Sequence, residues 1–231
     1  MCGIAGILSL NNSKIDTSVV ENIKKSLEHR GPDHSTYKFI NDRVCLIHTR
    51  LSIIDLNERS NQPMLTTDQR YSIVFNGEIY NYKELYALMD IDPETDSDCE
   101  VIIHMYKYYG IKQTLQMLDG VFAFMIYDYS NNCAYVARDT YGVRPLFFTK
   151  IRYLGKNFRD EQSWNGYNLS KYNSFDDHVW LDCFGFASEM KQLCDINIPL
   201  DCEKYTINQF KPGTYSSFKW NKEHDIWQLS T

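Results

Sequence analysis

The chain opens with MCGIAGIL, residues 1–8, a stretch that places a thiol beside the start of the chain and then continues into small and apolar residues. The run over 3–10 predicts a buried β-strand that ends at a turn of two asparagines. A cysteine on such a strand is usually a core residue, so spacing alone favours a packing role for Cys2. Residue chemistry offers a second interpretation, in which Met1 is removed and Cys2 carries the free amine of the chain.

A cysteine that carries a free α-amine supplies a nucleophile and a base from one residue. The pKa of an α-amino group is about 7.7–8.0, which suits a general base at neutral pH. Such a residue needs no catalytic histidine, so the lack of a clear Cys–His pair in the sequence does not argue against a nucleophilic Cys2. Both interpretations stay open at this point.

Length and composition describe one large globular domain with no bias towards nucleic acid or lipid. The 231 residues are 43% hydrophobic and carry a net charge of −6. Lysine and arginine do not cluster, which makes nucleic acid and anionic membranes poor partners. No apolar run is long enough to span a bilayer, and the N-terminal segment lacks the basic start of a signal peptide.

The seven cysteines include no C-x-x-C pair, and the six histidines show no H-x-x-x-H spacing. A disulfide framework and a zinc site would both show regular spacings. We therefore expect reduced thiols, a cytoplasmic location and no metal.

Hydrophobic periodicity predicts a strand-rich chain. We expect strands over 36–40, 43–48, 71–80, 121–139 (as a hairpin) and 145–150, and a helix over about 82–90. Capping boxes at Ser18 and Ser97 predict two further helices, of which the second ends at Gly110. Strand and helix signals return over 179–193, and a last short strand surrounds 210–215.

This order places helices in pairs between hairpins and not after every strand. It favours an α+β fold with antiparallel sheets over a doubly wound parallel sheet. The segment 151–178 is polar, rich in Asn and Tyr and without a period, which predicts a long loop or insertion.

FNGE, residues 75–78, allows two interpretations. Asn-Gly between apolar strands is most often a tight turn. An oxyanion hole, however, needs a side-chain amide and an unobstructed backbone N–H that converge on one point, and Asn76 followed by Gly77 supplies both.

Arg50 and Asp98 form a second ambiguous set. Arg50 at the end of a strand is equally well a surface charge, and Asp98 near a helix start suits the helix dipole without any ligand. Together, a guanidinium fork for a carboxylate and a carboxylate for an ammonium would clamp the zwitterionic end of an amino acid. Each signal alone is weak.

Longer motifs surround these residues along the chain. They are MCGIAGIL (1–8), HRGPD (29–33), RLSIIDL (50–56), QPM (62–64), FNGEIYNY (75–82), SDCEVI (97–102), LDGVFAF (118–124), RDTYGVRPLFF (138–148) and ASEMKQL (187–193). In this order they strongly resemble the N-terminal glutaminase domain of glutamine-hydrolysing asparagine synthetases, a class II glutamine amidotransferase domain, over nearly the whole chain. HRGPD, RLSIIDL and NGEIYNY favour this family over related amidotransferases.

The resemblance implies a four-layer αββα N-terminal-nucleophile (Ntn) hydrolase fold with two packed antiparallel sheets. It also implies a reaction in which Cys2 attacks the side-chain amide of glutamine, with its own amine as base. Asn76 and the Gly77 N–H would form the oxyanion hole, ammonia would leave, and water would convert the thioester to glutamate.

The resemblance assigns substrate-binding roles to three further residues. Arg50 would hold the glutamine α-carboxylate, and Asp98, helped by Glu78, would hold the ammonium. No metal or cofactor is implied for this domain.

The resemblance also sets expectations for the rest of the chain. We expect a glutamine amidotransferase domain over 2–215, with 151–178 as its polar insertion. The segment 216–231 is then a tail, or the start of a connection to an ATP-dependent synthetase domain, whose S-G-G-x-D-S loop the sequence does not contain. ATP and Mg would belong to that absent domain only, and the ammonia would serve the conversion of aspartate to asparagine.

Expected partners are glutamine and a synthetase domain or subunit, without nucleic acid or membrane, and a homo-oligomer is compatible with the sequence. Two alternatives stay open. The chain is a stand-alone glutaminase or an amidotransferase subunit for another acceptor, or it is a catalytically silent interaction or regulatory module.

Overall fold

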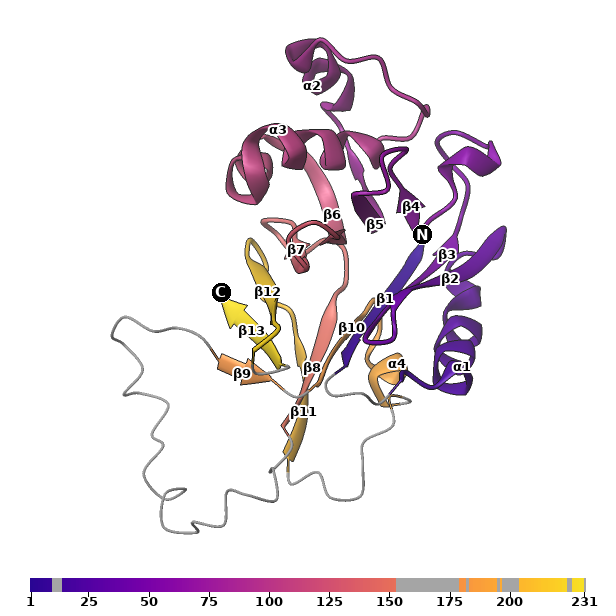
Figure 1. Cartoon of the computed structure of the whole chain (residues 1–231). Helices are drawn as coiled ribbons and strands as arrows, with labels where there is room; N and C mark the ends of the chain where they lie inside the picture. The colour runs from indigo at the N-terminus through magenta and orange to yellow at the C-terminus, as the bar shows by residue number, and fades with distance from the viewer. Residues whose placement is uncertain are drawn as a thin grey trace.

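The computed structural model of the chain describes residues 1–9, 14–152, 179–181, 183–194, 196, 204–223 and 226–230. These residues form two sheets, and helices lie beside each of them (Figure 1). The strand pairs of both sheets are antiparallel.

The strands follow one another across each sheet in an order that differs from their order in the chain. The first sheet runs β11 (Lys204–Gln209), β8 (Phe147–Arg152), β10 (Cys183–Ala187), β1 (Gly3–Ser9), β3 (Val44–Arg50) and β2 (His34–Asn41). The second runs β4 (Met64–Leu65), β5 (Tyr71–Ile79), β6 (Gly120–Asp128), β7 (Cys133–Arg138), β12 (Tyr215–Asn221), β13 (Ile226–Ser230) and β9 (Val179–Leu181).

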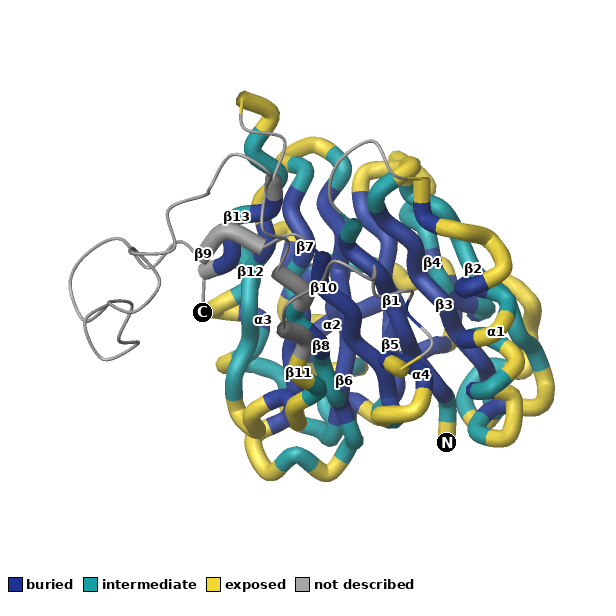
Figure 2. The backbone as a smooth tube through the Cα atoms, turned by 90° about the horizontal axis from the view of Figure 1, so that it is seen from below, coloured by how far each residue is buried: buried dark blue, intermediate teal, exposed yellow. Residues whose placement is uncertain are grey.

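Strand β1 lies inside the first sheet, between β10 and β3. Alternate residues of this strand enter two different cores, as the two-residue period of a strand requires. Ile4 and Leu8 pack between the two sheets, whereas Ala5 and Ile7 pack on the outer side. A strand with both faces covered reads as a continuous apolar run, which explains the opening of the sequence (Figure 2).

Helices cover the outer faces of both sheets. Helix α1 (Thr17–Leu27) and the short α4 (Met190–Cys194) pack on the first sheet, and the buried face of α1 includes Val20 and Ile23. Burial of each such side chain stabilises the fold by about 1.5–3 kcal/mol.

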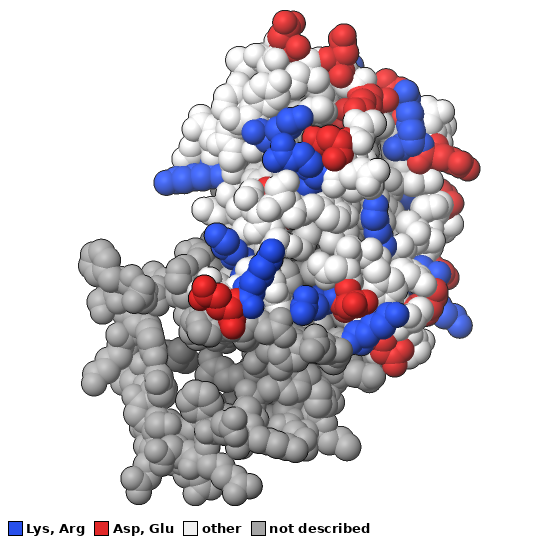
Figure 3. All heavy atoms as spheres, in the orientation of Figure 1, with Lys and Arg blue, Asp and Glu red and all other residues white. Residues whose placement is uncertain are grey.

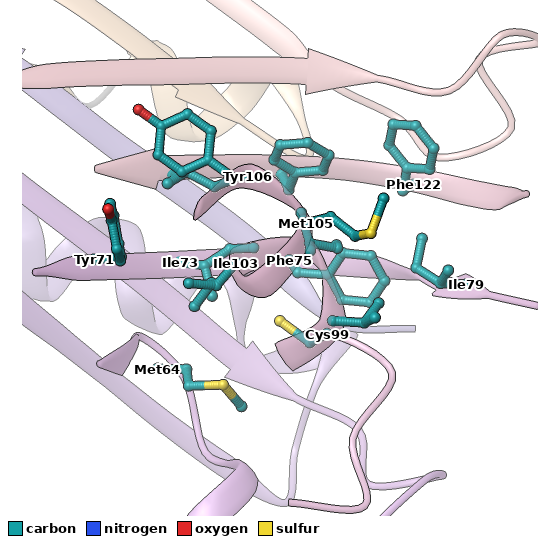
Figure 4. Packing of buried hydrophobic residues seen from close by; sticks show 14 of the residues in the cluster. Met64, Tyr71, Ile73, Phe75, Ile79, Cys99, Ile103, Met105, Tyr106 and Phe122 are labelled. Atoms are coloured by element: carbon teal, nitrogen blue, oxygen red, sulfur yellow. The ribbon is translucent and has the colours of Figure 1, made fainter. Parts of the chain in front are cut away.

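Helices α2 (Tyr82–Met89) and α3 (Glu100–Met117) pack on the second sheet. Figure 4 shows Ile103 and Met105 of α3 against Ile73 and Phe75 of β5. Helix, sheet, sheet and helix therefore make four layers, which confirms the predicted α+β, αββα architecture.

The two predicted capping boxes are wrong in detail. Helix α1 begins at Thr17 because Asp16 caps it, its Oδ1 accepting from the Ser18 N–H at 2.8 Å. Helix α3 begins after Cys99, since the Ser97 hydroxyl accepts the Cys99 N–H before the helix starts. The predicted end at Gly110 is a break within α3, where the glycine takes φ +71°.

Three further expectations concern strands. Asn76 and Gly77 lie inside β5 and pair with β6, so the interpretation of Asn-Gly as a tight turn is wrong. The segment 210–215 connects β11 to β12 through a turn at Gly213 and is not itself the core of a strand. Residues 151 and 152 of the predicted insertion at 151–178 belong to β8, and residues 153–178 lie outside the described residues.

The expectation of a tail after residue 215 is wrong for the part of it that the structure describes. Residues 215–221 and 226–230 form β12 and β13 of the second sheet. Phe218 and Trp227 are buried between the sheets, and the indole N–H of Trp227 donates to the Ser9 carbonyl at 2.9 Å. These residues therefore complete the core next to β1.

Candidate active site

A pocket of about 90 Å³ opens where β1, β3 and β5 come together. All six residues that the sequence singled out line it: Cys2, Arg50, Asn76, Gly77, Glu78 and Asp98. They come from both sheets and from the segment before α3, so the packing of the two sheets brings them together.

Cys2 lines the pocket directly before β1, and its contacts hold it in place. The Cys2 carbonyl accepts from Arg30 Nε at 3.1 Å, and the thiol lies 3.7 Å from the Leu51 carbonyl, to which it donates. The next contacts tie Ile4 to Ser188, with the Ile4 N–H donating to the hydroxyl at 3.0 Å. The thiol therefore has little freedom to leave the pocket.

Burial raises the pKa of the Cys2 thiol above its ordinary value. The hydrogen bond to Leu51, the ammonium at the start of the chain and Arg50 lower the pKa, but they do not cancel the effect of burial. A thiol with a raised pKa is protonated at neutral pH and is a weak nucleophile, so this site needs a base to activate it.

Asn76 offers the pocket an amide that has no other use in the structure. Its side chain is 2% exposed, and its Nδ2 is buried without a hydrogen-bond partner among the described residues. Buried amides are nearly always paired, because an unpaired one costs about 1–3 kcal/mol. A free donor in the pocket that the Cys2 thiol also lines suits a ligand-binding position.

Gly77 is needed because β6 passes too close for any side chain. A Cβ at this position would lie 2.3 Å from the Val121 carbonyl oxygen and 2.8 Å from Phe122 Cα. The turn interpretation explains Asn-Gly by a positive φ, but the structure explains the glycine by this close approach.

The strand that carries Asn76 is held by side chains from two other elements. Phe75 donates its N–H to Gln62 Oε1 at 2.6 Å, and its carbonyl lies 3.3 Å from His48 Nε2. Burial lowers the pKa of His48 to about 3, so this histidine is neutral and its Nε2–H can donate to the carbonyl. Both peptide groups of Phe75 are thus fixed next to Asn76.

Asp98 points into the pocket from the segment before α3. Its Oδ2 accepts from the Ile79 N–H at 2.7 Å, and the residue is 5% exposed. Burial, with a smaller contribution from the nearby Glu78 carboxylate, raises the pKa of Asp98 to about 6, against hydrogen bonds from backbone N–H groups that lower it. A buried carboxylate with few partners gains most from a cationic ligand.

Arg50 reaches the pocket from the end of β3, but its terminal nitrogens already have partners. Nη1 donates to the Asn57 carbonyl at 2.9 Å and to Asn61 Oδ1 at 2.7 Å, and Nη2 donates to the Asp55 carbonyl. A carboxylate that enters the pocket competes with these neutral acceptors, and a charged acceptor makes roughly twice as strong a bond.

Gln62, Ser60 and Arg144 also line the pocket, and the sequence assigned no role to them. Gln62 and Ser60 reach the site through the loop after β3, and Arg144 reaches it from the segment between β7 and β8. The motifs QPM and RDTYGVRPLFF contain Gln62 and Arg144, so these two residues could have been found from the motifs. Arg144 Nη1 lies 2.7 Å from Met1 Sδ, which shows how close the first residue lies to the site.

The described residues contain no cluster of His, Cys, Asp or Glu that could hold a metal ion. Within the same residues, no helix is both long and apolar enough to cross a bilayer. Lys and Arg are interspersed with Asp and Glu among the coloured residues of the face in Figure 3.

The fold is shared with solved amidotransferases. The glutamine phosphoribosylpyrophosphate amidotransferase from B. subtilis, complexed with ADP and GMP, superposes with a TM-score of 0.65 at 19% identity, covering 99% of this chain and 49% of that one. The enzyme solved as the allosteric regulatory enzyme of purine biosynthesis gives a TM-score of 0.64 at 20% identity. The chain has the predicted Ntn hydrolase fold.

A family model described as "Glutamine amidotransferase domain" matches residues 1–224, and the chain belongs to this family. Asparagine synthetase [glutamine-hydrolyzing] 2 of Arabidopsis thaliana is 37% identical over 94% of the chain. A probable asparagine synthetase [glutamine-hydrolyzing] of Acanthamoeba polyphaga mimivirus is 34% identical over 93%. The chain spans 32% and 33% of the length of these two relatives. The predicted resemblance to the glutaminase domain of asparagine synthetases is confirmed.

Proposed function

We propose that this chain hydrolyses glutamine to glutamate and ammonia through Cys2. The observation that carries the proposal is the buried, unpartnered amide of Asn76 in the same pocket as the Cys2 thiol. A thiol next to a free hydrogen-bond donor suits attack on a carbonyl whose oxygen becomes negative in the transition state.

In the proposed reaction, Met1 has been removed and the α-amine of Cys2 is free. The amine takes the thiol proton as sulfur attacks the amide carbon of glutamine, and the oxyanion is held by Asn76 Nδ2 and the Gly77 N–H. The amine then gives its proton to the leaving nitrogen, the C–N bond breaks, and ammonia departs. Water, deprotonated by the same amine, attacks the thioester, which releases glutamate and restores the thiol.

Recognition of glutamine is assigned to the two charged groups at the pocket wall. Arg50 holds the α-carboxylate, and Asp98, with Glu78 beside it, holds the α-ammonium. Burial of both charged side chains supports this assignment, because an amino acid supplies each of them with an opposite charge.

The ammonia is proposed to serve an ATP-dependent synthetase domain or subunit that converts aspartate to asparagine. The relatives named above, which are about three times as long as this chain, support that assignment. In this proposal the glutaminase domain needs no cofactor, and ATP and Mg belong to the partner. A cytoplasmic location is proposed from the cysteine pattern.

The test is reaction with a glutamine-shaped electrophile, followed by intact mass and peptide mapping. We expect loss of Met1 and one adduct, on Cys2, that excess glutamine blocks. Cys194, which is exposed on α4, provides the internal control because it reacts with a general alkylating agent whether or not glutamine is present.

Turnover assays complete the test with a matched pair of variants. Cys2→Ala should release no ammonia from glutamine, whereas Cys194→Ala should match the native chain. Retained Met1, or an unmodified Cys2 in the folded protein, would refute the proposal and leave the silent module as the better account. Rapid turnover without any synthetase would instead favour a stand-alone glutaminase.

A further inference from the structure

The two proposed halves of the glutamine clamp lie next to two separate loops. We call residues 51–61, which follow β3, the Arg50 loop, and residues 90–99, which lie between α2 and α3, the Asp98 loop. Glutamine would touch Arg50 and Asp98 at once, so the spacing of these loops sets the spacing of the two charges. Contacts between the two loops would therefore fix the distance between Arg50 and Asp98.

Asp55 is the centre of the Arg50 loop. Its side chain has no solvent-exposed area. Its Oδ1 accepts from Asn57 N at 3.0 Å and from Asn57 Nδ2 at 2.6 Å, and its Oδ2 accepts from the Ser60 hydroxyl at 2.5 Å. Its backbone carbonyl accepts from Arg50 Nη2. One residue thus folds the loop and orients the guanidinium.

The same carboxylate also reaches the Asp98 loop. Asp55 Oδ2 accepts from the Asp96 N–H at 3.0 Å, two residues before Asp98. Burial alone would raise the pKa of Asp55, but hydrogen bonds from Ser60, Asn57 and Asp96 outweigh burial and hold the pKa below its ordinary range. The connection between the loops is therefore made by a permanently charged acceptor.

Arg59 makes a second connection at the surface. Its Nη1 donates to the Glu94 carbonyl at 3.1 Å, and its Nη2 lies 2.6 Å from Asp96 Oδ2. Its Nε lies 3.4 Å from Asp55 Oδ2. The far side of the Asp98 loop is held to α3 by Glu100, which accepts from the Thr95 N–H at 2.7 Å. The loop is thus fixed on both sides.

We propose that Asp55, with Arg59, is a positioning residue that ties the Arg50 loop to the Asp98 loop and fixes the spacing at which Arg50 and Asp98 receive the two charges of an α-amino acid. This inference rests on the proposed function and deepens it. It assigns to Asp55 the selection of substrates that carry both an α-carboxylate and an α-ammonium.

Loss of the connection at Asp55 should lower the selectivity for both charged groups of the substrate. A site built for two charges rejects a substrate that lacks one, because the unmatched charge of the protein stays buried and unpaired. A change in Arg50 alone weakens only the recognition of the carboxylate, and a change in Asp98 alone weakens only that of the ammonium. Loss of the connection at Asp55 displaces both groups and weakens both.

The experiment compares kcat/KM for three amides: glutamine, glutaramate (glutamine without its α-amine) and γ-aminobutyramide (glutamine without its α-carboxylate). Asp55→Asn is the variant of choice because Asp55 has φ +50°, and asparagine tolerates that conformation. We expect the preference for glutamine over each analogue to fall by about tenfold, with unchanged alkylation of Cys2 by iodoacetamide.

Asp128→Asn is the matched control. Asp128 is buried and accepts from Ser130 N at 2.9 Å, Asn131 N at 3.1 Å and the Tyr106 hydroxyl at 3.0 Å, but it does not line the pocket. A variant that only lowers the fraction of folded protein reduces all three rates equally, so Asp128→Asn should keep both preferences.

Unchanged preferences in a folded, active Asp55→Asn chain would overturn the inference, as would the loss of only one preference. If Asp55→Asn does not fold, Arg59→Gln decides in its place. The Arg59 side chain is 50% exposed, and we expect both preferences to fall by a smaller factor; unchanged preferences would again overturn the inference. A native chain that hydrolyses no glutamine refutes the proposed function itself, and this inference with it.

Discussion

Replacement of Asp98 by asparagine should make the protein more stable and less able to bind glutamine. Burial and the neighbouring Glu78 raise the pKa of Asp98 from 3.8 to about 6, so the folded protein holds its ionised form at a cost. A difference of about two pKa units corresponds to about 3 kcal/mol. Asparagine removes this cost and keeps an oxygen that can accept the Ile79 N–H.

Proton linkage determines how the free energy of unfolding changes with pH and over which pH range it changes. Below the unfolded pKa of 3.8, Asp98 is neutral in both states and the substitution has no effect on stability through charge. Between 3.8 and about 6, the folded state binds more protons than the unfolded state, so the free energy of unfolding falls as the pH rises. The advantage of Asp98→Asn is then about 1 kcal/mol at pH 4.5 and about 3 kcal/mol at pH 7.5.

The assay is urea or thermal unfolding of the native chain and of Asp98→Asn at pH 4.5 and 7.5, monitored by circular dichroism. An advantage of about 3 kcal/mol corresponds to a rise in Tm of about 6–12 °C for a domain of this size. Asp92→Asn, which removes an exposed carboxylate from the same loop, should show no such gain. A variant that is no more stable than the native chain at pH 7.5, or an advantage that is the same at both pH values, would refute the reasoning.

Three further predictions follow from the same site. Arg50→Lys should raise the KM for glutamine by about tenfold or more with a smaller effect on kcat, because a point charge replaces a planar fork; an unchanged KM would remove Arg50 from the clamp. Gly77→Ala should lower the free energy of unfolding by about 1–3 kcal/mol, since its Cβ would lie 2.3 Å from the Val121 carbonyl, and a variant as stable as the native chain in urea would contradict this. His48→Gln should be less sensitive to acid than the native chain, because the lowered pKa of His48 withdraws stability as the pH falls below about 6.5, a loss that unfolding measured at several pH values would detect.

Much of the site could be predicted from the sequence, because its residues belong to short motifs that can be recognised locally. Cys2 follows Met1, Asn76 and Gly77 are adjacent, Arg50 lies at the end of a strand, and Asp98 lies near the start of a helix. Local sequence could not decide between a turn and a strand at Asn-Gly, because only pairing with β6 keeps β5 extended through it. The same limit applies to Asp16, which lies two residues before the predicted cap and makes the capping bond instead.

Other features depend on distant partners that no local pattern reveals. Gln62 acts on the Phe75 peptide group, thirteen positions away, and Asp55 acts on Asp96 in another loop. The sequence predicts a tail after residue 215, because its local pattern does not indicate that β12 and β13 belong to the second sheet. Their place became evident only from their pairing with β7 and from the burial of Trp227.

The position of β1 between β3 and β10 has a consequence for the timing of events on the ribosome. The Ile4 N–H donates to the hydroxyl of Ser188, which lies 184 positions further along the chain. Contacts between such distant residues form late. One edge of β1 therefore stays unpaired until β10 has been translated, which requires most of the domain. We expect this interval to be the one in which an aminopeptidase reaches Met1, before Arg144 comes to lie against it. Under the proposed function, Met1 can thus be removed from Cys2 before the pocket forms around the thiol.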